Sequence, residues 1–112
     1  MGFNLSRYND IHLYTSDRLA HIMGNGQLAL IDRRTGFEEL LGADTAGFYT
    51  SEDEFYDMLK YFKDTPSARM KVAQKGYEVY HNEFNNEDVT RFMAEILFST
   101  FKKPQKKWQI VI

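Results

Sequence analysis

The sequence predicts an α/β fold: a small parallel sheet with flanking helices and a C-terminal helical cap, arranged like the second half of a Rossmann-like domain. Three observations support this prediction. Short apolar segments alternate with helical patterns along the first half of the chain. One of these segments, Leu28–Ile31, is continuously apolar, as expected for a strand covered on both faces. The second half of the chain then shows three successive helical patterns.

Length and composition predict one cytoplasmic domain with a sizeable core. The chain has 112 residues, of which 43% are hydrophobic and 15% aromatic. The net charge of -2 gives no general attraction to nucleic acid or to an anionic membrane surface. The sequence has no Cys, which excludes disulfides and thiol chemistry and fits a cytosolic protein. No apolar run approaches the ~20 residues that a membrane span needs, and residues 1–10 do not read as a signal peptide.

The first predicted elements are a strand, a helix and a second strand. Gly2–Leu5 is short and half apolar, and a helix is expected from about Ser16 to Met23. Gly24-Asn25-Gly26 ends this helix, because Gly and Asn tolerate a left-handed cap. Leu28–Ile31 follows as a strand, so Asp32-Arg33-Arg34 lies at the carboxyl end of a strand, where α/β sheets bind ligands.

Two capping boxes predict the next helices. Thr35–Glu38 opens a short helix that runs through Leu41, and Ala46–Tyr49 is the third strand. Ser51–Glu54 opens a longer helix, expected at residues 52–63. The buried stripe of that helix is predicted to consist of Phe55, Met58, Leu59 and Phe62.

The C-terminal part is predicted to be helical up to a short tail. Thr65-Pro66 is a strong helix start, and Met70, Ala73, Tyr77 and Tyr80 then follow at helical spacing. Asn86 is predicted to cap a last helix. Its inward residues are expected to be Val89, Phe92, Met93, Ile96 and Leu97. Residues 1–101 then form the partial Rossmann-like domain. Residues 102–112 form a basic and apolar tail with solvated lysines, in which Trp108 is a candidate anchor for a partner.

The most informative segment for function is the start of the first helix. Thr15, Ser16 and Asp17 are all good N-caps, and the N–H groups and dipole at such a start favour an anion such as a phosphate. The alternative is an ordinary cap that binds nothing. Arg18 lies in the first turn, where the dipole disfavours a cation, which indicates a nearby anion. The alternative for Arg18 is an ion pair with Asp17 or Asp10.

The order of these segments resembles the C-terminal, donor-side part of GT-B glycosyltransferases, in particular the group 1 segment related to spore-maturation CgeB-like proteins. The resemblance runs from about Asn4 to Phe101. Its most telling pieces are DRLAHIMGNG, followed by an apolar strand, and the later helix ARMKVAQKGYEVYHNEFN. It implies a nucleotide diphosphate sugar as the ligand, with the first turn of the helix meeting the diphosphate.

The site residues that the resemblance implies are Thr15, Ser16 and Arg18 near the phosphates and His21 near the ribose. In the family, a glutamate five residues before the glycine binds the ribose, and His21 stands at that position here. A neutral His still hydrogen-bonds a hydroxyl, but the bidentate carboxylate is absent. A second glutamate of the family would fall near Leu13 and is also missing. The alternative for His21, which its place beside an apolar stripe favours, is a partly buried structural role. No metal and no further cofactor are predicted.

Two functions follow from this reading. The chain is either the donor-side portion of a glycosyltransferase that needs a missing N-terminal lobe, or a non-catalytic α/β assembly module derived from that family. Three short strands leave an edge of the sheet open, so self-association through this edge is the alternative to pairing with the missing lobe. A receiver-like domain is disfavoured, because no acidic pair accompanies Asp32. No Walker, GxGxxG, HExxH or GxSxG motif is present.

Overall fold

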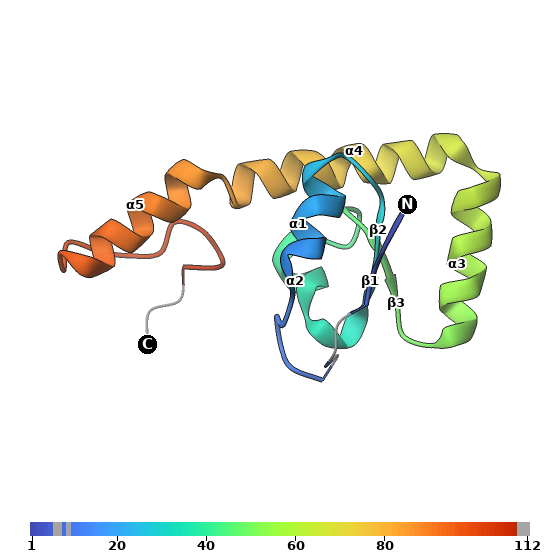
Figure 1. Cartoon of the computed structure of the whole chain (residues 1–112), viewed down its shortest axis with the longest axis horizontal. Coiled ribbons are helices and arrows are strands. Elements are labelled where there is room, and N and C mark those ends of the chain that lie inside the picture. The colour runs from blue at the N-terminus through green and yellow to red at the C-terminus, as the bar shows by residue number, and fades with distance from the viewer. Residues whose placement is uncertain (6–7, 9, 110–112) are drawn as a thin grey trace.

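The structure is a computed structural model that describes residues 1–5, 8 and 10–109. Its centre is a three-stranded sheet of β1 (Gly2–Asn4), β2 (Ala29–Asp32) and β3 (Gly47–Tyr49), in the order β1-β2-β3 (Figure 1). Both strand pairs are parallel, with Asn4 beside Ile31 and Asp32 beside Tyr49. The predicted α/β fold with a small parallel sheet is confirmed.

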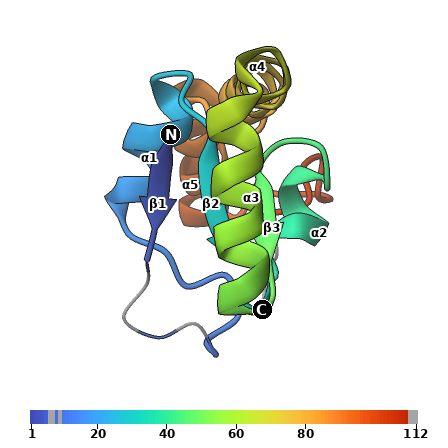
Figure 2. The same cartoon turned by 90° about the vertical axis from the view of Figure 1, so that its right-hand side faces the viewer.

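Helices cover both faces of the sheet. α1 (Asp17–Gly24) and α2 (Phe37–Leu41) lie on one face, and α3 (Glu52–Asp64) lies on the other (Figure 2). A short 3-10 turn, η1 (Arg33–Thr35), connects β2 to α2. The helices α1 and α2 share a face because each connects two adjacent parallel strands by a crossover of the same hand.

The centre of the core is β2, which is buried on both faces as predicted. Ala29 and Ile31 pack with α1 and α2, whereas Leu28 and Leu30 pack against α3. All four side chains are at most 1% exposed. Burying such a Leu or Ile contributes about 1.5–3 kcal/mol each. The predicted stripe of α3 is confirmed, since Phe55, Met58, Leu59 and Phe62 all face this second cluster.

A long helix, α4 (Pro66–Glu83), crosses the amino ends of the strands. Gly76 allows this close crossing, because a Cβ atom there would collide with the carbonyl group of Thr45. Of the predicted α4 residues, Ala73 is buried and Tyr80 packs on the α1 cluster, while Met70 is 67% exposed. The helix therefore closes the amino end of the sheet and leaves the carboxyl end open.

The last helix, α5 (Asn86–Leu97), extends away from the sheet and is followed by a tail that folds back under it. Asn85, not the predicted Asn86, is the N-cap, and its side chain accepts a hydrogen bond from the Asp88 N–H group. The prediction that the whole apolar stripe points inward is wrong. Phe92 packs on Phe101 and Trp108, but Met93 and Leu97 are 65% and 76% exposed.

The tail packs against the protein through Trp108 and Lys106, while Lys102, Lys103 and Lys107 are exposed, as predicted for a tail with solvated lysines. Trp108 lies between Phe84 and Phe92, and its Nε1 group donates to the Glu83 carbonyl over 2.6 Å. Lys106 donates to the Asn82 carbonyl. Residues 110–112, which complete the predicted apolar tail, lie outside the described residues. Trp108 thus anchors the tail to α4 and α5, so an anchoring role toward a partner is not supported.

Among the described residues, no helix has the length and apolar character required to cross a membrane.

Candidate functional site at the carboxyl edge of the sheet

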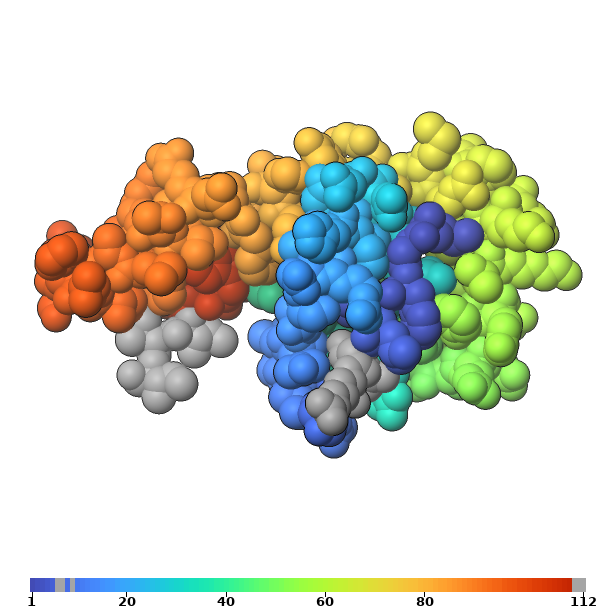
Figure 3. All heavy atoms as spheres, in the orientation of Figure 1, coloured from blue at the N-terminus to red at the C-terminus, as the bar shows by residue number. Residues whose placement is uncertain are grey.

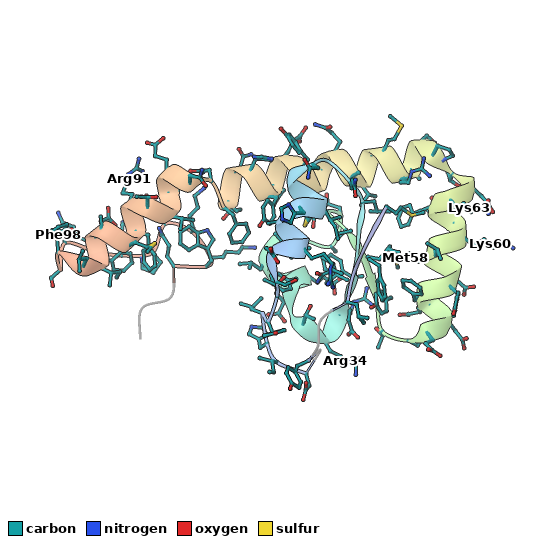
Figure 4. The ribbon with its side chains drawn as sticks, viewed as in Figure 1. Arg34, Met58, Lys60, Lys63, Arg91 and Phe98 are labelled. Atoms are coloured by element: carbon teal, nitrogen blue, oxygen red, sulfur yellow. The ribbon has the colours of Figure 1, made fainter. Side chains whose placement is uncertain are left out.

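The ends of all three strands meet at one edge of the sheet, opposite to α4. Because the strands are parallel, the residues that follow them start together at this carboxyl edge. The first turn of α1 lies there too, since Nη1 of Arg18 donates to the carbonyl oxygen of Leu5, directly after β1, over 2.6 Å. Arg34, which follows β2, lies at the same edge (Figure 4).

The start of α1 has the geometry of a capped but exposed helix terminus. Ser16 is the N-cap, as predicted, and its hydroxyl accepts a hydrogen bond from the Arg18 N–H group over 3.4 Å. Thr15 donates its hydroxyl to the Ser16 carbonyl. Thr15, Ser16 and Arg18 are therefore brought together at the edge, and all three are exposed. This turn presents N–H groups, hydroxyls and a guanidinium to an approaching anion.

Neither predicted ion pair of Arg18 forms in the described part of the chain. Its guanidinium group instead donates to the Leu5 carbonyl, which ties the first turn of α1 to the end of β1. That hydrogen bond orients the side chain without neutralising its charge. Arg18 therefore keeps an exposed positive charge at the terminus of α1.

His21 lies one helical turn beyond Asp17 and faces solvent. Its side chain is 75% exposed, so the prediction of a partly buried structural histidine is wrong. The imidazole Nε2 lies 3.9 Å from the nearest Asp17 carboxylate oxygen, an i,i+4 arrangement on the outer surface of α1. His21 thus lies on the same helix as Arg18, about one turn farther from the carboxyl edge of the sheet.

The end of β2 carries an ion pair between Asp32 and Arg34, in the segment that the sequence places at the carboxyl end of a strand. The Asp32 carboxylate accepts hydrogen bonds from Nη2 of Arg34 at 2.6 Å and from Nε at 3.0 Å. It also accepts from the Arg34 N–H group over 2.9 Å. Asp32 is only 3% exposed. The hydrogen bonds and positive charge of Arg34 lower the pKa of Asp32 against the opposing effect of burial.

A second network holds the corner between β3 and α3. Arg33 pairs with Glu38 over 2.6 Å and donates to the Thr50 hydroxyl over 3.2 Å. Glu54 accepts from the Thr50 N–H group over 2.6 Å, and the Glu54 N–H group donates to Ser51. The predicted cap at Ser51 is confirmed. The predicted box at Thr35–Glu38 is wrong, because Gly36 is the N-cap of α2 and the Glu38 side chain pairs with Arg33.

A pocket of about 390 Å³ opens at this edge between β1, β3 and α3. It combines aromatic and polar side chains. Its lining includes Phe3, Leu5, Asp32, Arg34, Tyr49, Thr50, Ser51, Glu52, Phe55 and Tyr56. Sequence reasoning missed this pocket, because its residues come from three separate stretches of the chain and local patterns do not state which side chains meet across the strand ends. A larger hollow of about 660 Å³ lies where α3 meets α4, away from this edge.

One buried polar group at this edge has no partner. Asn4 is 2% exposed, and neither its side-chain nitrogen nor its oxygen makes a hydrogen bond with any residue that the structure describes. Asn4 lies on the face that α1 covers, as Gly2 does, where an added Cβ would meet Ile22. It precedes Leu5, whose carbonyl group binds Arg18. An unpaired buried amide costs free energy, so Asn4 destabilises the fold at a point directly beside the terminus of α1.

Across residues 1–5, 8 and 10–109, no group of three or more His, Cys, Asp or Glu side chains is arranged to hold a metal ion. The polar groups of the edge are hydrogen-bond donors, hydroxyls, the ion pair of Asp32 with Arg34, and the charged side chains of Arg18 and Glu52. These groups suit an organic anion or a polyhydroxylated ligand.

Residues 1–95 match the glycosyl transferase-like family. The chain belongs to this family. The match spans the sheet, α1–α4 and most of α5, and so includes every residue of the carboxyl edge described above. No curated protein and no solved structure matches the chain.

Proposed function

We propose that this glycosyl transferase-like chain is the donor-side, C-terminal portion of a GT-B glycosyltransferase of the CgeB-like type, and that it is cytoplasmic. Its ligand would be a nucleotide diphosphate sugar, and the proposal specifies neither the sugar nor the base. The observation that carries the proposal is the family match over residues 1–95, together with the exposed, cationic start of α1 at the carboxyl edge. The isolated chain would lack the acceptor lobe and be inactive by itself.

In this proposal, Thr15, Ser16 and Arg18 bind the diphosphate. Negative charge grows on the diphosphate as the bond to the sugar breaks, and preorganised donors at that point stabilise the transition state. The N–H groups of the first turn, the two hydroxyls and the Arg18 guanidinium are such donors. The hydrogen bond from Arg18 to Leu5 fixes the guanidinium in advance, which reduces the entropy lost on binding.

His21 is the proposed ribose contact. Its exposed imidazole can donate to or accept from one hydroxyl group. A single hydrogen bond is weaker than a bidentate carboxylate, so we propose that the chain binds the ribose weakly and relies on the diphosphate for affinity. Asp17, which lies beside His21, would compete for the imidazole.

The experiment compares binding of UDP, GDP, ADP and dTDP by isothermal titration calorimetry in the wild type and in Ser16→Ala, Arg18→Gln and Arg91→Gln. Arg91 is a matched control, since it is an exposed arginine on α5, far from the sheet. We expect binding of at least one nucleotide to weaken about tenfold in Arg18→Gln and to stay unchanged in Arg91→Gln. Equal affinities in all four proteins would refute the assignment of the α1 terminus.

The second candidate function is a non-catalytic assembly module, and the free edge of β1 favours it. No strand pairs with the outer side of β1 within the described ranges, and Met1, Phe3 and Leu5 are 44%, 42% and 54% exposed. Figure 3 shows β1 at the surface beside α1. Light scattering across a range of concentrations tests this function. A dimer without nucleotide affinity supports the module, and a monomer at all concentrations contradicts self-association.

A further inference from the structure

The pocket between β1, β3 and α3 is built differently from the terminus of α1. Aromatic rings form its floor: the centroids of Phe3 and Phe55 are 4.8 Å apart, and those of Tyr49 and Phe55 are 5.1 Å apart. Tyr56 continues this group, with its ring 5.7 Å from Phe55. Phe3 and Tyr56 remain 42% and 63% exposed, so their ring surfaces are available to a ligand. At about 390 Å³, the pocket has the size of a small-molecule site.

The rim of the pocket offers polar groups that have no partner in the part of the chain that the structure describes. Arg34 is held by Asp32 through Nε and Nη2, and its Nη1 group makes no hydrogen bond to any described residue. Glu52, in the first turn of α3, has no ion-pair or hydrogen-bond partner among the same residues. A donor with a fixed position and a free carboxylate thus border the aromatic floor.

The charge of the lining decides which chemistry the pocket accepts. Asp32 and Arg34 neutralise each other, and Glu52 adds a negative charge. A phosphate would be repelled by Glu52, and a purely apolar ligand would leave the carboxylate and the guanidinium unsatisfied. A neutral pyranose avoids both the repulsion and the unsatisfied polar groups. Its C–H face can stack on an aromatic ring, and its hydroxyls can donate to a carboxylate and accept from a guanidinium.

We propose that this pocket is a binding site for a neutral pyranose, with Tyr56 and Phe3 stacking on the sugar ring and Glu52 and Arg34 hydrogen-bonding its hydroxyls. This assignment extends the proposed function and rests on it. In a glycosyltransferase, the bound pyranose would belong either to the donor or to a glycan acceptor. The pocket lies on the face of the sheet that α3 covers, and the α1 terminus lies on the other face. Ligand binding at the two sites therefore shifts different amide signals.

The test is a protein-observed amide NMR titration of the whole chain with neutral methyl glycosides of glucose, galactose and mannose and with N-acetylglucosamine. We expect saturable shifts at Phe3, Thr50, Glu52 and Tyr56 for at least one sugar, with a dissociation constant of about 1–50 mM. The absence of saturable shifts with every sugar at about 100 mM overturns the proposal.

Two pairs of variants on α3 separate a pocket from an unspecific surface effect. Tyr56→Ala and Glu52→Gln remove groups of the pocket, whereas Tyr61→Ala and Asp53→Asn change a tyrosine and a carboxylate at exposed positions outside it. All four side chains are exposed, so the variants are expected to fold. The pocket variants should weaken sugar binding about fivefold or more and the controls less than twofold. Equal binding by both pairs contradicts the proposal.

The outcomes also separate this proposal from the proposed function. Nucleotides that shift only residues 15–18, with no sugar bound at the pocket, overturn the sugar site and leave donor binding intact. If sugars bind the pocket while no nucleotide shifts the amides at the α1 terminus, the sugar site is supported and the proposed donor binding is overturned. If two copies instead meet through the pocket, Tyr56→Ala lowers the dimer fraction in light scattering and no sugar binds, which overturns the sugar site.

Discussion

The sheet unit, residues 1–83, and the C-terminal arm, α5 with the tail to residue 109, differ in what covers their apolar residues. In the sheet unit, β2 is buried on both faces and the stripe of α3 meets it. In the arm, α5 has no fully buried residue. The helices α3 and α5 both have amphipathic sequences, and a side chain caps the amino terminus of each. The comparison teaches that an apolar stripe predicts a helix, whereas burial depends on a surface for that stripe to meet.

The largest expected effect breaks the sheet unit at its centre. Ile31→Ala removes a fully buried side chain that packs between β2 and α1, and it should lower the free energy of unfolding by about 2–5 kcal/mol. Urea denaturation followed by circular dichroism measures this loss. The matched change on the arm, Leu97→Ala, should alter stability by less than about 0.5 kcal/mol, because Leu97 is 76% exposed. Similar losses in both variants would invalidate the comparison.

The next effect concerns Asp32, at the carboxyl edge of the sheet unit. Asp32→Ala removes the acceptor of three Arg34 groups, the backbone N–H, Nε and Nη2, and should cost about 1–3 kcal/mol of unfolding free energy. Because the pKa of Asp32 is lowered in the folded protein, its stabilising contribution is present above the unfolded value of about 3.9 and is lost as pH falls through the folded pKa.

The pH dependence of this pair is measured by urea titrations of wild type and Asp32→Asn from neutral pH into acid. The stability difference between the two proteins should be constant near neutrality and shrink below about pH 4. Asp53, in the exposed first turn of α3, provides the control variant Asp53→Asn. A difference that grows in acid would contradict a lowered pKa of Asp32.

A smaller and local effect is expected in the arm. Trp108→Ala removes the ring that joins Phe84 to Phe92 and the hydrogen bond to the Glu83 carbonyl. Hydrogen exchange should become faster in α5, while β2 keeps its protection, because the arm contributes little to the packing of the sheet. Loss of protection in β2 would show that the arm and the sheet unit unfold as one body.

The smallest effect is expected at His21. The imidazole and the Asp17 carboxylate form an exposed pair with 3.9 Å between the closest atoms. Such pairs contribute about 0–1 kcal/mol, so His21→Ala should leave thermal stability nearly unchanged. Nucleotide affinity should fall by only about twofold, since one exposed hydrogen bond is lost. Calorimetry of the variant would contradict this account if nucleotide binding disappeared.

Local patterns predicted the elements of the sheet unit well. The continuous run Leu28–Ile31 predicted the buried central strand, and Ser16 and Ser51 predicted two helix starts that the structure confirms. These features depend on neighbours within a few residues. The prediction for α5 was wrong at Met93 and Leu97, because sequence spacing describes a stripe without stating whether a surface faces it.

The carboxyl edge was predictable only in part. The sequence placed Asp32-Arg33-Arg34 after a strand, but the ion pair with Asp32 and the contacts of Arg33 with Glu38 and Thr50 depend on how the turn η1 folds. The pocket depends on rings from β1, β3 and α3, which only tertiary structure brings together. The exposure of His21 likewise depends on which side of α1 faces the sheet.

The most direct test of the central claim is an amide NMR titration of this chain with UDP, GDP, ADP and dTDP. The claim is that the carboxyl edge binds the diphosphate of a nucleotide sugar through the start of α1. The account predicts saturable shifts for at least one nucleotide, concentrated at residues 15–18 and weaker at Asp32–Thr35. Shifts that are absent for all four nucleotides, or that are confined to α5, would contradict it.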